Sequence, residues 1–132
     1  MTVPETGQTK ARELYAAATA TDGDEPFRLS EDVADKLATA CDKLVDDLQK
    51  ARRTGHLATE VRGFPDLPTG NDLAAGFAGK GRQLLDTVTA FQQTALLYKA
   101  AYLAAGRRFA DAEAANKAAF DLIANTQWPT PR

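Results

Sequence analysis

The chain has 132 residues but few of the side chains from which metal and catalytic sites are usually built. It contains one cysteine, Cys41, and one histidine, His56. A single cysteine excludes an intramolecular disulfide and a cysteine-rich metal centre, and no Glu-x-x-His spacing is found. Cys41 falls on an apolar stripe where a packed thiol is expected, and His56 follows a predicted helix end. We therefore expect no cofactor, no metal and no enzymatic activity.

Long apolar runs and a strong charge of one sign are also missing. Sixteen Lys and Arg residues are balanced by eighteen Asp and Glu residues, which leaves a net charge of -2. With no basic stripe to neutralise phosphates, we expect no binding to nucleic acid. No run reaches the roughly 18 to 20 apolar residues of a membrane span, and the N-terminus does not resemble a Sec signal peptide. We expect a protein that is cytoplasmic before any export, is not inserted in a membrane, and is secreted or displayed without a cleaved signal peptide if it leaves the cell.

Period-two alternation is absent, so the pattern predicts an all-α fold. A short N-terminal helix is expected over Lys10–Ala20, within a segment comprising residues 1–28. Ser30 is a suitable N-cap for a first long helix over 31–54, because acidic residues follow it directly. The apolar side of that helix is expected to comprise Val33, Leu37, Cys41, Leu44, Leu48 and Ala51.

The stretch from Gly63 to Gly70 holds two prolines and two glycines and predicts a bend. A second helix is expected to follow, capped by Asn71 or Asp72 and weak in its first two turns because of Gly76, Gly79 and Gly81. From Arg82 to Ala124 it is expected to run as one unbroken element, with 125–132 forming a short tail. Residues 29–124 would then form an antiparallel helical hairpin whose second helix is much longer than the first. Such a hairpin is typical of one part of a helical bundle.

Residues 77–123 keep a continuous 4-3 spacing of apolar or small side chains, which favours packing along another helix. The first helix is too short to cover this row. We therefore predict a protein partner, either a second helical hairpin or another copy of this chain. Leu96 and Leu103, on the opposite face, are expected to be covered by a second chain; the alternatives are that they are single exposed apolar residues or are covered by the N-terminal segment. The predicted partner interface comprises Leu84, Val88, Phe91, Tyr98, Tyr102 and Phe109.

An acidic first helix turn, a Gly/Pro bend and a long alanine-rich helix containing Leu103-Ala-Ala-Gly-Arg-Arg-Phe109 occur together here. In these features the chain resembles the helical-hairpin proteins of actinobacterial type VII (ESX) secretion systems, namely the WXG-like proteins and the EspC-like secretion-associated group. That family carries an export signal of the form Tyr-x-x-x-Asp/Glu. The resemblance assigns its two positions to Phe109 and Glu113, with Phe in place of Tyr. The Trp-x-Gly of the family bend is missing.

The resemblance implies a type VII secretion substrate, or the helper of a larger substrate, that binds a partner through its helices. Two other functions use the same apolar row. One is a cytoplasmic adaptor or antitoxin-like binding protein, for which no export is expected. The other is a structural homodimer, in which the row pairs with its own copy around a two-fold axis.

Overall fold

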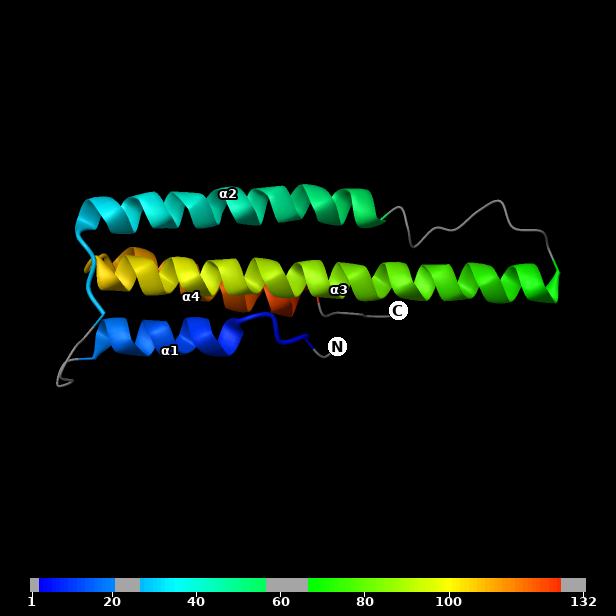
Figure 1. The fold of residues 1–132 in the computed structure, drawn as a ribbon, viewed down its shortest axis with the longest axis horizontal. Helices are drawn as coiled ribbons and strands as arrows, with labels where there is room; N and C mark the ends of the chain where they lie inside the picture. The colour runs from blue at the N-terminus through cyan, green and yellow to red at the C-terminus, as the bar shows by residue number, and fades with distance from the viewer. Residues whose placement is uncertain (1–2, 21–26, 57–66, 127–132) are drawn as a thin grey trace.

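The computed structural model describes residues 3–20, 27–56 and 67–126. These residues form four helices: α1 (Gln8–Thr19), α2 (Glu31–His56), α3 (Pro68–Ala105) and α4 (Phe109–Thr126). No strand occurs in these ranges, so the all-helical prediction is confirmed. Each of α1, α2 and α4 packs on α3, whereas the backbones of these three helices make no contact with one another (Figure 1). The fold is therefore organised around α3.

The first two helices follow the sequence prediction closely. α1 covers nearly the expected range, and α2 begins at the expected residue. The Ser30 hydroxyl oxygen accepts a hydrogen bond from the Val33 amide at 3.2 Å, so Ser30 caps α2 as predicted. Glu31 and Asp32 then place negative charge at the positive end of the helix dipole.

α3 begins four or five residues before the start expected from a cap at Asn71 or Asp72. The last three residues of the predicted bend, 68–70, already belong to the helix, and Pro68 stands in its first turn. Proline is well suited to this position because its fixed φ matches the helix and its missing N–H is not needed there. The rest of the bend, 63–66, lies outside the described residues. The predicted tail also loses its first two residues, because α4 continues to Thr126.

The prediction of a single helix over 82–124 is wrong. α3 ends at Ala105, and α4 folds back along it after a turn of three residues. In the turn the Arg107 amide donates to the Ala104 carbonyl at 3.0 Å, and the Arg108 amide donates to the Leu103 carbonyl at 2.8 Å. These two bonds form a Schellman motif. Its left-handed position is occupied by Arg107, with φ of 66°, although glycine is the usual residue there.

Tertiary contacts explain why the helix stops at this point. The Leu29 amide, from the connection between α1 and α2, donates to the Ala105 carbonyl at 3.0 Å. That carbonyl would bond to residue 109 if the helix continued. Gly106 lies so close to α2 that a Cβ added to it would be 2.4 Å from the Cβ of Ala34. The end of α3 is therefore fixed by segments that are distant in sequence.

The interior of the protein is built mainly from alanine. One group of buried residues joins the ends of α1, α3 and α4, together with α2, and comprises Ala18, Ala38, Leu103, Ala104, Ala105 and Ala112. A second group comprises Ala11, Leu97 and Ala119. Leu103 is only 3% exposed and is covered by this chain's own helices. The expectation that a second chain covers Leu103 is therefore wrong, because the return of α4 was not foreseen.

Two glycine substitutions are expected to have opposite effects on stability. Gly106→Ala should lower the free energy of unfolding by about 1 to 3 kcal/mol, because the new methyl group collides with Ala34. Gly76→Ala should raise it by about 0.5 to 1 kcal/mol, because nothing lies within 4 Å of the added Cβ and alanine favours helix. Urea denaturation followed by circular dichroism measures both. Equal effects of the two substitutions would contradict the close packing at Gly106.

Candidate protein interaction site

One side of α3 is left without a covering helix. The Gln92 side chain reaches α2, where its amide nitrogen donates to the Val45 carbonyl at 3.2 Å. The Thr94 hydroxyl lies 2.9 Å from that of Thr6, just before α1. At about 100° per residue, Phe91 lies between these two directions, roughly 100° from Gln92 and 60° from Thr94. In Figure 1, α1 and α2 flank α3 and α4 lies behind it, so the side of α3 toward the viewer has no helix over it.

Large apolar side chains follow this open side along α3. Leu73, Phe77, Leu84 and Phe91 are separated by four, seven and seven residues and therefore share one face of the helix. Their exposed fractions are 48%, 58%, 53% and 45%. We call these four residues the α3 stripe. The N-terminal part of α3 extends beyond the end of α2 in Figure 1.

α2 adds two exposed apolar residues to the same side. Val33 is 42% exposed and Leu44 is 49% exposed. Each stands two residues, or about 200° around the helix, from an aspartate, Asp35 or Asp42, that lines the groove facing α4. They therefore point away from α4 and border the open side of α3. The α3 stripe together with Val33 and Leu44 is called the uncovered face below.

The sequence analysis assigned Val33 and Leu44 to the inner side of α2 and so missed their role. The residues of α2 that are buried are Ala34, Ala38 and Cys41. This row of small residues is rotated from the predicted row of larger ones. A second signal was therefore present in the sequence, since alanines at a spacing of four indicate a close helix contact.

The predicted interface residues are divided between two helices. Leu84 and Phe91 belong to the uncovered face, and Val88 is half-buried beside them. Tyr98 and Tyr102 are also half-buried, and their ring centroids are 5.9 Å apart. Phe109 stands instead at the start of α4, with the Arg107 guanidinium 4.9 Å from its ring centroid. It therefore does not extend the α3 stripe.

Phe109 and Glu113, the two positions of the candidate export signal, occupy the first turns of α4. Phe109 is 43% exposed, and Glu113 is exposed as well. Their i, i+4 spacing places the ring and the carboxylate next to each other on the helix surface. Phe120, which is 71% exposed, follows Phe109 by eleven residues and lies on the same face. The sequence analysis did not single out Phe120.

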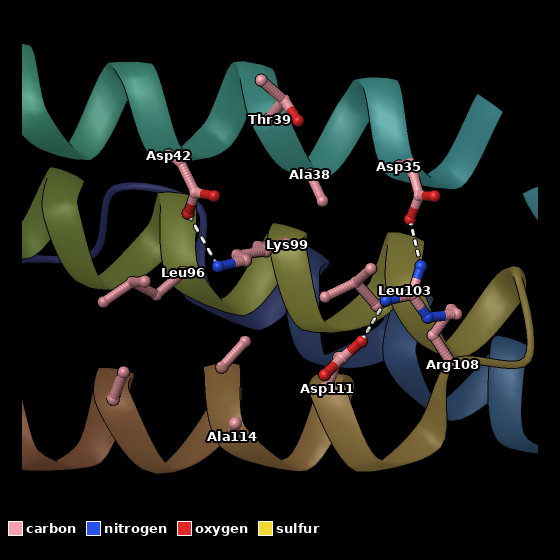
Figure 2. Close-up of a pocket in the computed structure, with 12 residues that line it drawn as sticks. Asp35, Ala38, Thr39, Asp42, Leu96, Lys99, Leu103, Arg108, Asp111 and Ala114 are labelled. Carbon is pink, nitrogen blue, oxygen red and sulfur yellow. Dashed lines mark hydrogen bonds and ion pairs between the residues drawn. The ribbon is translucent and has the colours of Figure 1, made fainter. Parts of the chain in front are cut away.

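A groove of about 540 Å³ separates α2 from α4, with Leu96, Lys99 and Leu103 on its floor (Figure 2). Lys99 Nζ lies 2.7 Å from an oxygen of Asp42 on α2. Arg108 contacts Asp111 on α4 and Asp35 on α2, and Figure 2 shows it reaching toward both carboxylates.

The hydrogen bond to Asp111 and the charge of Asp35 raise the pKa of Arg108 above its usual value. Every charged side chain that lines the groove is therefore paired with another that does so. The groove thus holds α2 and α4 in place across α3 and offers no unpaired charge to a ligand. Because the paired groups are between 25% and 55% exposed, each pair adds only modestly to stability and acts mainly to orient α2 and α4.

Comparisons with protein-family models, with curated proteins and with solved structures gave no match to this chain. In residues 3–20, 27–56 and 67–126, no helix is long and apolar enough to cross a membrane. The same ranges hold no group of three or more His, Cys, Asp or Glu residues arranged to bind a metal ion. The uncovered face, with its exposed large apolar side chains, is therefore the feature of the described surface that points most directly to a function.

Cys41 is expected to react slowly with thiol reagents while the protein is folded. Burial of the side chain, assisted by the nearby charge of Asp42, raises the pKa of Cys41 to about 11. At pH 8 only on the order of one thiol in a thousand would then be ionised, and the thiolate is the reactive form. Labelling with Ellman's reagent with and without guanidinium measures the difference. Rapid labelling of the folded protein would show that the thiol is accessible.

Proposed function

We propose that this protein acts by binding a helix of a partner protein along its uncovered face, as a substrate or helper in type VII secretion. The observation that carries the proposal is the row of exposed large apolar side chains on a side of α3 that no helix covers. Soluble monomers seldom expose a contiguous apolar surface of this kind, and such surfaces mark interaction sites. The binding part of the proposal depends on this row alone.

A helix is the partner element that fits the row best. Spacings of four and seven residues recur where two helices pack side by side, because each turn presents a side chain to the same neighbour. From Leu73 to Phe91 the row is about 27 Å long at 1.5 Å per residue. A partner helix of about eighteen residues with apolar side chains at the same spacing would cover it. Val33 and Leu44 lie beside residues of α3 beyond Phe91, so a partner helix would contact them only if it continued past Phe91 toward the end of α3.

The assignment to type VII secretion rests on the resemblance of residues described above. α2 and the later part of α3 are antiparallel neighbours, in keeping with a helical hairpin. The exposed pair Phe109 and Glu113 on α4 supports a role as a recognition signal, since both side chains can be reached from outside. The turn at 106–108 is a departure, because it makes α4 a separate helix.

Partner binding is tested most directly at Leu84 and Phe91. Their side chains are about half exposed, so Leu84→Ser with Phe91→Ser should leave the fold intact and weaken the complex by at least a hundredfold. Tyr98 and Tyr102 are less suitable because they are half-buried within this chain. The double variant is co-expressed with candidate helical-hairpin partners, and the complexes are measured by light scattering after size exclusion. Phe120→Ser, on α4, is the matched control.

Four outcomes are possible, and they separate the candidate functions. A complex that is lost in the double variant but kept in the control supports binding at the uncovered face. A defined homodimer of the wild-type chain that the double variant abolishes would favour the structural homodimer. Binding without export from the native host would favour a cytoplasmic adaptor or antitoxin-like protein. A complex that the double variant keeps would overturn the proposed interface.

The export signal is tested separately on α4. Phe109→Ala or Glu113→Gln should reduce the secreted amount at least tenfold without changing the helix content, because both side chains are exposed. Phe109→Tyr restores the hydroxyl group of the family signal and should keep or increase export. Lys117→Gln, an exposed substitution on the same helix, is the control. Immunoblots of culture filtrate and cell lysate measure the ratio, and an unchanged ratio in the first two variants would remove the signal assignment.

A further inference from the structure

The turn between α3 and α4 interrupts a pattern that is continuous in the sequence. Tyr102, Ala105, Phe109, Ala112 and Asn116 keep the 4-3 spacing of one helix across residues 106–108. No proline occurs between Pro68 and Thr126, so nothing in the covalent chain forbids a helix there. The same residues are therefore compatible with two arrangements, a hairpin of two helices and a single long helix.

The hairpin arrangement has a cost at one residue. Arg107 adopts φ of 66°, in the left-handed region that is unfavourable for side chains other than glycine. In a straight helix Arg107 would have an ordinary conformation, and the amides around it would form regular helical hydrogen bonds. Straightening the turn therefore relieves a local strain. Opposing it are the hydrogen bond between the Leu29 amide and the Ala105 carbonyl and the contact of Arg108 with Asp35.

α4 is also held by few partners. Its backbone packs on α3 alone, and the residues it buries are the alanines 112, 115 and 119. Ala112 lies in a cluster with Leu103 and Ala104 of α3, to which Ala18 and Ala38 contribute from α1 and α2, and Ala119 lies in a cluster with Leu97 of α3 and Ala11 of α1. We call this surface of α3 the α4 seat. A helix attached mainly through one surface of small residues can detach from α3 without unfolding. Only α4 of another copy of this chain would restore every contact.

We infer that α4 exchanges between two copies of this chain. The 106–108 turn straightens, α3 and α4 join into one helix, and α4 of each copy packs on the α4 seat of the other. Leu103 is in one cluster with Ala112, and Leu97 is in another with Ala119. In both pairs the midpoint in the sequence falls at residues 107 and 108. A two-fold axis through the turn therefore reproduces both contacts in the dimer. Such an exchange closes the dimer through contacts that the monomer already possesses. It leaves the uncovered face free and does not depend on the proposed function.

Two substitutions at the hinge form a matched pair. Arg107→Gly and Arg107→Ala both remove the Arg107 contacts with Ala18 and Phe109. Glycine tolerates the left-handed turn and disfavours helix, whereas alanine does the opposite. Because the exchanged dimer contains two straightened hinges, its dissociation constant should be on the order of tenfold or more lower for Arg107→Ala than for Arg107→Gly. Each full-length variant is refolded from guanidinium at a series of concentrations, and its mass is measured by light scattering.

A cross-link then distinguishes exchange from other dimers. Leu96 on α3 and Ala118 on α4 both line the groove beside the α4 seat. Leu96→Cys with Ala118→Cys, in a Cys41→Ala background, is treated with a short bis-maleimide. In the hairpin the link joins two residues of one chain. In the exchanged dimer it joins two chains, and a denaturing gel then shows a covalent dimer. The single-cysteine variants control for random cross-linking.

The results either support or overturn the exchange. A dimer that cross-links between chains and is favoured by Arg107→Ala over Arg107→Gly supports it. A dimer whose links stay within each chain would mean that two copies associate through another surface, and the inference would be wrong. Monomers at every concentration, with links within the chain in both hinge variants, would also overturn it. The monomer result does not bear on partner binding at the uncovered face, because Leu84 and Phe91 take no part in the exchange. If a dimer forms with links within each chain, Leu84→Ser with Phe91→Ser shows whether it uses the uncovered face.

Discussion

The close approach of three helices to α3 is the constraint on which the structure depends. Small side chains make it possible: most of the buried apolar residues are alanines, and Gly106 meets Ala34 at a distance that admits no Cβ. Close approach gains dispersion contacts over the whole length of a helix pair, but it leaves no space inside for bulky groups. Among the described residues, Gln92 is the large side chain with less than 2% of its surface exposed, and it is bonded to Val45, Gln49 and Arg52.

Because the closely packed helices leave room mainly for small side chains between them, several large apolar residues lie on the surface. Three helices packed on a fourth leave part of its circumference open, and in this chain the open part carries Leu73, Phe77, Leu84 and Phe91. Exposure of these residues lowers stability relative to a fold that buries them, since a fully buried Leu or Phe contributes about 1.5 to 3 kcal/mol. That stabilisation becomes available when another helix covers the row. The arrangement thus links the alanine-rich interior to the interaction surface.

Sequence reasoning predicted those features that depend on local signals. The Ser30 cap, the start of α2 and the presence of a short N-terminal helix follow from residue types within one or two turns. The row containing Leu84 and Phe91 was found because its spacing is visible in the sequence. The end of α3 was not predicted, because it depends on Leu29 and Ala34, which are about seventy residues away in the sequence. The prediction that Val33 and Leu44 are buried was wrong for a related reason. It assumed that the large apolar residues of α2 mark its buried side, whereas the buried residues are mostly alanines.

The turn at 106–108 shows how a local and a tertiary preference can disagree within one segment. The 4-3 spacing and the absence of proline favour a continuous helix, whereas the contacts of Leu29, Ala34 and Asp35 favour the turn. In most proteins glycine at the left-handed position would settle such a conflict in favour of the turn. Here glycine stands one position too early, and Arg107 must adopt the unfavourable conformation. The tertiary contacts therefore hold the hairpin against the preference of the local sequence, and anything that removes them shifts the balance toward the straight helix.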